Sequence, residues 1–132
     1  MQVFQLSDSL SVSGQILVQD IEAIAAAGFK VLINNRPDHE VLDQPDSDEL
    51  ATAAQRAGLD YYHMPITARD FPGPDIKQMA SLIDDPGKPA LAFCRTGTRC
   101  ANLWVWTRPE QKRESAIATA RQFGFDLSMA GT

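Results

Sequence analysis

Short apolar runs alternate with helix-like segments along almost the whole chain, and this alternation most constrains the fold. Short runs rich in apolar residues predict strands, and the segments between them carry apolar residues at helical spacing. We therefore expect one α/β domain over residues 1–132, with a mainly parallel central sheet covered by helices on both faces. The expected strands are Val3–Leu6, Leu10–Val12, Phe29–Ile33, Asp60–Met64 and Ala90–Phe93. The expected helices are Leu17–Ala27, about Asp48–Ala57, Pro74–Ile83, about Cys100–Thr107 and Glu110–Phe123, with a frayed tail or short edge element from Gly124 onward.

Polar segments follow three of the expected strands. They are Asn34–Asp38, Thr67–Asp70 and Cys94–Arg99. In sheets of this kind, ligands bind outside the carboxyl ends of the strands. We therefore expect the chemistry of the protein at one edge of the sheet, where these three segments meet.

The segment Cys94–Arg99 joins a buried strand to a helix. Its backbone N–H groups and the helix N-terminus are expected to form an anion site. A thiol placed there meets the helix dipole and two guanidinium groups, which lower its pKa from about 8.5 into a nucleophilic range of roughly 3.5–7.5. We interpret Cys94 as a reactive nucleophile for an anionic substrate. The alternative is a buried core cysteine, the commoner role of a free thiol.

The other residues of this loop have roles that follow from their chemistry. Arg99 suits bidentate contact with a tetrahedral oxyanion, or it ties the loop to a neighbouring carboxylate. Arg95 is expected at the pocket rim, where it sets the charge preference for substrate. Gly97 permits a backbone turn that residues with a Cβ avoid. Thr96 and Thr98 are expected first to stabilise the loop and second to donate to substrate.

Three blocks of the sequence together resemble the bacterial beta-lactamase-hydrolase-like family of phosphatase-like domains, which is related in fold to dual-specificity phosphatases and rhodaneses. The blocks are Leu10–Gln15, Ala27–Asp38 and Cys94–Arg99 with Leu103-Trp104. The resemblance implies a cysteine-dependent enzyme with an anion-binding loop. The resemblance leaves two reactions open. The family's name and fold indicate a phosphatase, whereas members linked to sulfide detoxification behave as sulfurtransferases.

Loop length favours one of these reactions. Arginine comes five positions after Cys94, whereas tyrosine-phosphatase loops place it six positions after, so the loop resembles the tighter one of rhodaneses. The leading prediction is sulfane-sulfur transfer through a Cys94 persulfide to a thiol acceptor. The alternative is phosphomonoester hydrolysis through phospho-Cys94, with Asp70 as general acid, unless Asp70 is only a solvated loop carboxylate. A third reading is a non-catalytic anion-binding module.

Four further residues near the loop have open roles. Asn35 and Arg36 follow an expected central strand, and either line the pocket as anion-binding groups or brace the loop. Cys100 packs in a helix or serves as a resolving partner for Cys94, which would require the loop to deform. Trp104 is expected to pack behind the loop.

Composition excludes several other functions. A net charge of -5 argues against nucleic acid as the main partner. We expect a cytoplasmic protein, because no apolar run approaches the roughly 20 residues of a membrane helix and the N-terminus lacks a signal-peptide pattern. Two cysteines and two histidines at these spacings make neither a disulfide framework nor a metal site. The expected partners are a small anionic substrate (persulfide, thiosulfate or phosphomonoester) and, for sulfur transfer, a thiol acceptor, with no cofactor.

Overall fold

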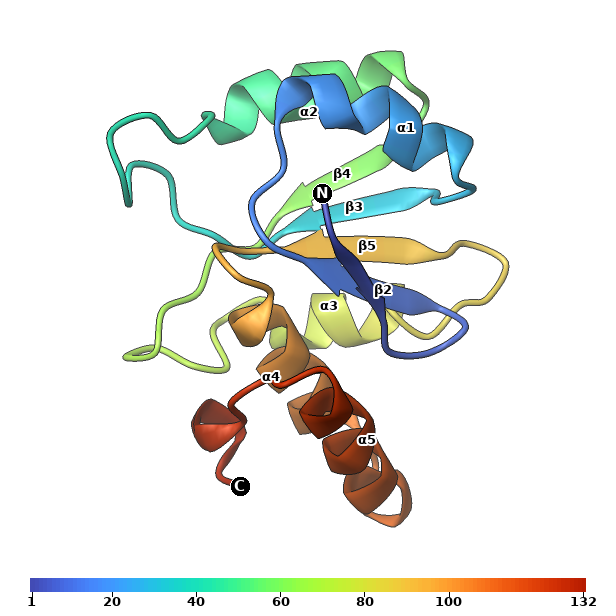
Figure 1. The fold of residues 1–132 in the computed structure, drawn as a ribbon, viewed down its shortest axis with the longest axis vertical. Coiled ribbons are helices and arrows are strands. Elements are labelled where there is room, and N and C mark those ends of the chain that lie inside the picture. Colours follow the sequence, from blue (N-terminus) through green and yellow to red (C-terminus); the bar gives the residue numbers. More distant parts are fainter.

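The computed structural model describes residues 1–132, which form a five-stranded sheet in the order β1-β2-β5-β3-β4 (Figure 1). Strands β1 and β2 form an antiparallel hairpin, and all other neighbours in the sheet are parallel. The mainly parallel sheet predicted from the sequence is therefore confirmed. The strands are β1 (Val3–Gln5), β2 (Leu10–Ser13), β3 (Val31–Asn34), β4 (Asp60–His63) and β5 (Ala90–Phe93).

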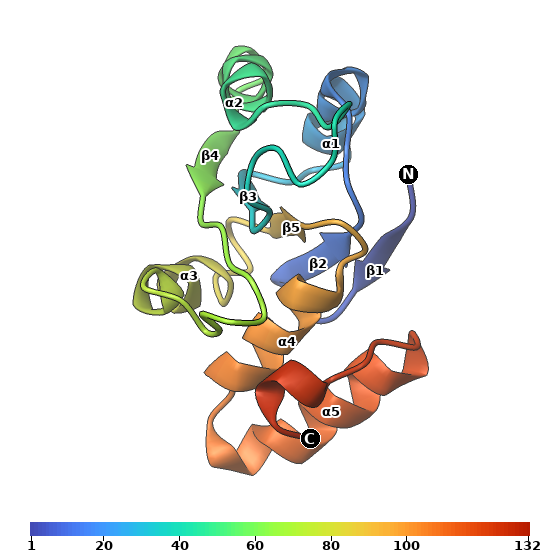
Figure 2. The ribbon, with the colours of Figure 1, turned by 90° about the vertical axis from the view of Figure 1, so that its left-hand side faces the viewer.

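Helices cover both faces of the sheet, as predicted (Figures 1 and 2). One face carries α1 (Ile21–Ala26), preceded by the short 3-10 turn η1 (Val18–Asp20), and α2 (Ser47–Arg56). The other face carries α3 (Ile76–Leu82), α4 (Thr98–Thr107), α5 (Glu110–Gln122) and the short turn η2 (Ser128–Ala130). The central strand β5 lies between β2 and β3, so the segment that follows it emerges in the middle of the sheet edge.

Side chains of the central strand alternate between two apolar cores. Ala90 and Ala92 point into the core under α3, α4 and α5, whereas Leu91 and Phe93 point into the core under α1 and α2. All four side chains are fully buried. Burying a side chain as large as Phe93 contributes about 2–3 kcal/mol. The small alanines leave room on the other side for Trp104, which is also buried.

The boundaries of three helices differ from the sequence-based expectation. Helix α1 begins at Ile21 rather than at Leu17, because Val18–Asp20 form the 3-10 turn η1. Helix α4 begins at Thr98, two residues before the expected start at Cys100. This earlier start places Arg99 in the first turn of the helix and shortens the loop after β5. Helix α3 begins at Ile76, two residues after the expected start at Pro74, and Asp75 is its N-cap residue.

The segment after Gly124 is neither a frayed tail nor an edge strand, so that prediction was wrong. Phe125 and Leu127 are buried. The buried Asn102 amide of α4 donates to the Asp126 carbonyl at 2.8 Å and accepts from the Ala130 N–H at 2.9 Å. These bonds fasten the C-terminal segment to α4.

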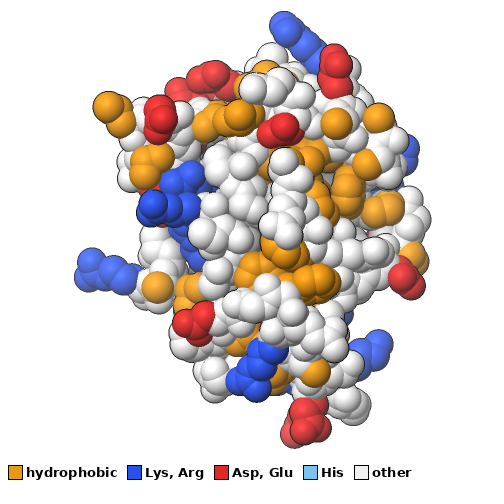
Figure 3. Space-filling view, viewed as in Figure 1, with side chains coloured by type: hydrophobic (Ala, Val, Ile, Leu, Met, Phe, Trp, Pro, Cys, Tyr) orange, Lys and Arg blue, Asp and Glu red, His pale blue; other side chains and the backbone are white.

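On the face in Figure 3, several Lys and Arg side chains lie on the left, level with the carboxyl ends of the parallel strands in Figure 1, and others lie at the top and the bottom of the molecule. None of the helices combines the length and the apolar character required to cross a membrane.

Candidate active site

Cys94 is the first residue after β5, at the carboxyl edge of the sheet. Its Sγ accepts a hydrogen bond from the Gly97 N–H at 3.1 Å, and only 1% of the residue is exposed. The end of β2 holds the loop in place, since the Cys94 N–H donates to the Ser13 carbonyl at 3.4 Å and the Gln15 N–H donates to the Arg95 carbonyl at 3.2 Å. The sulfur therefore sits at a fixed position beneath a loop that is bonded to the neighbouring strand.

Gly97 turns the loop into the helix. Its φ of 92° lies in the left-handed region, which side chains with a Cβ rarely adopt. A Cβ at this position would also approach the Phe125 ring to 3.2 Å. The glycine predicted to permit this turn therefore does so, and the turn directs its N–H at the Cys94 sulfur.

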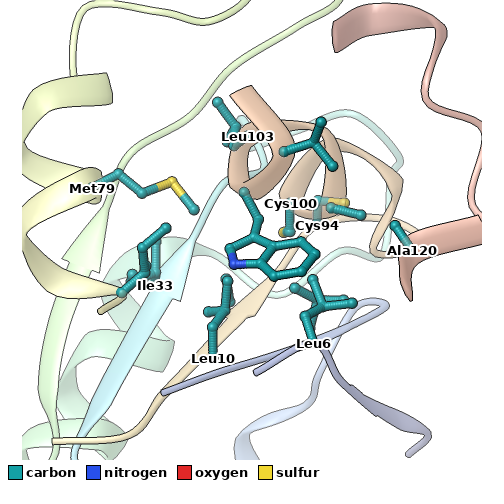
Figure 4. Packing of buried hydrophobic residues seen from close by; sticks show 14 of the residues in the cluster. Leu6, Leu10, Ile33, Met79, Cys94, Cys100, Leu103 and Ala120 are labelled. Atoms are coloured by element: carbon teal, nitrogen blue, oxygen red, sulfur yellow. The ribbon is translucent and has the colours of Figure 1, made fainter. Parts of the chain in front are cut away.

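The surroundings of the Cys94 sulfur favour the thiolate, and its pKa falls from 9.0 to about 5. The largest cause is a hydrogen bond from the Cys100 thiol, while burial opposes the shift. Backbone N–H groups and the Arg99 guanidinium lower the pKa further. Burial raises the pKa of Cys100 well above its usual value, so Cys100 stays protonated and able to donate. Figure 4 shows both side chains next to one another in the apolar cluster.

Arg99 ties the loop to a carboxylate, one of the two roles that the sequence left open for it, and belongs to a wider ion-pair network. Its Nη1 and Nη2 atoms donate to the two carboxylate oxygens of Glu40 at 2.9 and 2.8 Å, and Nη1 also donates to the Ile66 carbonyl at 3.0 Å. The buried Arg36 guanidinium donates to the same carboxylate from Nε at 2.8 Å and to Gln15 from Nη1 at 2.9 Å. The hydrogen bond from Arg99 is the main reason that the pKa of Glu40 is about 2.

A cavity of about 460 Å³ opens above the loop. Four of the residues predicted for the site line this cavity, namely Arg95, Thr96, Thr98 and Arg99. The Thr96 and Thr98 hydroxyls are hydrogen-bonded to one another at 2.9 Å, in keeping with a loop-stabilising role. The remaining lining residues are Glu40, Thr67, Ala68 and Met129.

Asp70 lies outside this cavity. Its side chain accepts hydrogen bonds from the Thr67 N–H at 2.6 Å and the Thr67 hydroxyl at 2.9 Å, and it is exposed to solvent. The bonds from Thr67 lower the pKa of Asp70, which keeps the carboxylate ionised. A general acid must carry a proton to donate. In this structure the bonds from Thr67 hold the Asp70 carboxylate against its own loop.

Asn35 and Arg36 lie behind the cavity and do not line it. Asn35 is fully buried, and its Nδ2 donates to the Met64 carbonyl at 2.9 Å. Arg36 is 3% exposed, with its guanidinium turned toward Glu40 and Gln15. The Asn35 side chain thus bonds to the segment that follows β4, and the Arg36 side chain bonds to the segment that follows β2 and to Glu40.

Two comparisons of the sequence point to one family. Residues 2–110 match the family model described as the beta-lactamase hydrolase-like protein, phosphatase-like domain. A beta-lactamase hydrolase-like protein of Agrobacterium fabrum is 32% identical over 98% of this chain, and one of Xylella fastidiosa is 31% identical over all of it. The chain spans 31% of the length of each of these relatives.

Solved structures share the fold. The crystal structure of a putative phosphatase from Neisseria meningitidis is 36% identical, with a TM-score of 0.79, over 96% of this chain and 92% of that chain. TpbA of P. aeruginosa, solved in complex with pTyr, is 13% identical with a TM-score of 0.67, over 97% of this chain and 76% of that chain. At this identity, the second likeness concerns the fold alone.

Proposed function

The chain belongs to the phosphatase-like domain family of beta-lactamase hydrolase-like proteins, and from this premise we propose that it is a cysteine-dependent sulfurtransferase. The Cys94 thiolate attacks the outer sulfur of a sulfane donor. From a persulfide, Cys94–S⁻ and RS–SH give Cys94–S–SH and RS⁻. An acceptor thiolate then attacks the outer sulfur of the Cys94 persulfide, which yields R′S–SH and regenerates the Cys94 thiolate.

One observation carries this proposal: the Cys94 thiolate is stabilised, but no protonated carboxyl group lies beside it to act as a general acid. Two carboxylates lie near the loop. Glu40 is ionised between two guanidinium groups, and Asp70 is ionised and bonded to Thr67. Sulfur transfer suits such a site, because thiolates and sulfite leave without needing a proton, whereas an alkoxide needs a general acid worth about 10²–10⁴-fold in rate.

Phosphomonoester hydrolysis is the second candidate, favoured by the likeness to the Neisseria structure, whose name describes a putative phosphatase. In that reaction the Cys94 thiolate attacks phosphorus, and the alkoxide leaves with a proton as ROH. Water then cleaves the phosphocysteine and releases inorganic phosphate. A substrate with a good leaving group, such as p-nitrophenyl phosphate, would lessen the need for an acid.

Intact-protein mass spectrometry separates these candidates. The protein is incubated with glutathione persulfide, with thiosulfate and with p-nitrophenyl phosphate, beside a Cys94→Ser variant. We expect the wild type to gain the mass of one sulfur atom, to lose it on addition of a thiol, and the variant to gain none. Steady phosphate release without a sulfur adduct would instead establish the hydrolase. Tight sulfate binding in the absence of both reactions would show that the protein is a non-catalytic anion-binding module.

A further inference from the structure

Glu40 occupies one whole edge of the Arg99 guanidinium. Its two oxygens accept from Nη1 and Nη2 at 2.9 and 2.8 Å, and the Ile66 carbonyl accepts a second bond from Nη1 at 3.0 Å. A guanidinium has five N–H donors, so three are used. Only the Nε–H and one Nη2–H of Arg99 remain for a substrate.

A second arginine fixes Glu40 in this position. Arg36 Nε donates to Glu40 Oε1 at 2.8 Å, and the Arg36 side chain is only 4% exposed. Gln15 in turn holds Arg36 through a bond of 2.9 Å. The carboxylate is therefore clamped between two guanidinium groups and cannot swing away from Arg99 at little cost.

The charges at the site nearly cancel as a result. The positive charges of Arg36 and Arg99 face the negative charges of Glu40 and the Cys94 thiolate. Arg95, at the exposed rim of the cavity, is the one lining cation without a carboxylate partner. A doubly charged anion entering the cavity would meet little net positive charge, whereas a donor with one charge or none at its reacting sulfur would meet little repulsion.

We propose that Glu40 is a positioning residue that sets the substrate class, favouring low-molecular-weight persulfides over dianions such as thiosulfate and phosphomonoesters. This inference rests on the proposed sulfur transfer. Glu40 acts through Arg99: it cancels the charge of that guanidinium and limits the donors that the guanidinium can offer. In its protonated form, RS–SH, a persulfide carries no charge on its outer sulfur, so the reaction of this form with the Cys94 thiolate needs little charge compensation. A dianion needs more positive charge than Arg99 supplies while Glu40 is paired with it.

Three variants test the role of Glu40. Glu40→Gln removes the charge but keeps the shape, and Glu40→Asp keeps the charge on a side chain too short to hold both Nη atoms from the same backbone position. Asp43→Asn is the matched control, because this exposed carboxylate lies on the same segment and has no ion pair. Sulfate binding is measured by calorimetry, and kcat/KM is measured for glutathione persulfide and for thiosulfate.

We expect Glu40→Gln to bind sulfate about tenfold more tightly, as removal of one nearby charge implies at an intermediate effective dielectric constant. The ratio of kcat/KM for thiosulfate to that for persulfide should rise by a similar factor, chiefly through KM. Glu40→Asp should shift both quantities in the same direction by less, and Asp43→Asn should leave both unchanged.

Unchanged or weaker sulfate binding in both Glu40 variants would overturn the inference. Thermal melting shows whether each variant folds. If Glu40→Gln does not fold, the test rests on Glu40→Asp. Sulfate binding requires no turnover. If the wild type takes sulfur from neither donor, the proposed function fails, while the binding data still decide whether Glu40 limits the charge of the ligand.

Discussion

Replacing Cys100 by alanine tests the source of Cys94 reactivity. The fall in the Cys94 pKa from 9.0 to about 5 corresponds to about 5 kcal/mol of preference for the thiolate. The hydrogen bond from the Cys100 thiol is its largest single cause. A hydrogen bond to a charged group contributes about 1.5–3 kcal/mol, so its loss should raise the Cys94 pKa to about 6–7. The cavity left by one sulfur atom should cost only about 1 kcal/mol of stability.

Absorbance of the thiolate at 240 nm, followed from acid to neutral pH, measures this pKa directly. Cys94→Ser identifies the step that belongs to Cys94. Cys100→Ser is the matched control, because its hydroxyl still donates and should keep the pKa close to that of the wild type. The pH at which kcat/KM is half-maximal should move with the titration. If the pKa in Cys100→Ala stays near 5, then backbone N–H groups and Arg99 suffice, and the role given to Cys100 is wrong.

Three further predictions follow from the site. Asp70→Asn should change kcat for sulfur transfer by less than about threefold. A loss in kcat of about 10²-fold would show that Asp70 acts as a general acid. Gly97→Ala should lower stability by about 1–3 kcal/mol in urea unfolding, because of its positive φ and the contact with Phe125, and an unchanged midpoint would contradict this reason. The pKa of Glu40 falls from 4.5 to about 2 on folding, so its ionisation stabilises the fold above about pH 4.5, and this contribution is lost as the pH falls toward 2. Because solvent screens this partly exposed carboxylate, the stability difference between wild type and Glu40→Gln should be about 1 kcal/mol larger at pH 7 than at pH 3. A difference independent of pH would show that Glu40 is not held as described.

The sheet and the loop were predictable from the sequence because both depend on local patterns. Strand β5 is a continuous apolar run, and Cys94–Arg99 follows it without interruption, so the residues of the loop arrive together. The rule that ligands bind at the carboxyl ends of parallel strands then located the site. No knowledge of distant contacts was needed for these steps.

The partner of Arg99 was not predictable by the same means. Glu40 lies 59 residues away in the sequence, on the long segment between β3 and α2. Nothing in its local pattern distinguishes Glu40 from the other acidic residues of that segment. The available signal was the expectation that Arg99 ties the loop to a carboxylate, which left open the identity of that carboxylate.

Side-chain direction explains the other differences. Asp70 was placed correctly in a loop near the site edge, but its bond to Thr67 turns the carboxylate back onto its own loop. Asn35 and Arg36 follow β3 as expected, yet their side chains are buried and bonded to neighbouring segments instead of lining the cavity. Sequence position gives the edge of the sheet on which a residue lies, and packing decides which way it points.

The bonds from Asn102 to the C-terminal segment have a consequence for the entrance to the cavity. Met129, on η2, forms part of the cavity wall, and Asn102 anchors residues on either side of it to α4, the helix that follows Cys94. Local melting of these last residues would thus widen the opening of the cavity that Met129 lines together with Arg95 and Arg99. Sequence changes in the segment from Asp126 to Ala130 should therefore alter how bulky a ligand this cavity admits.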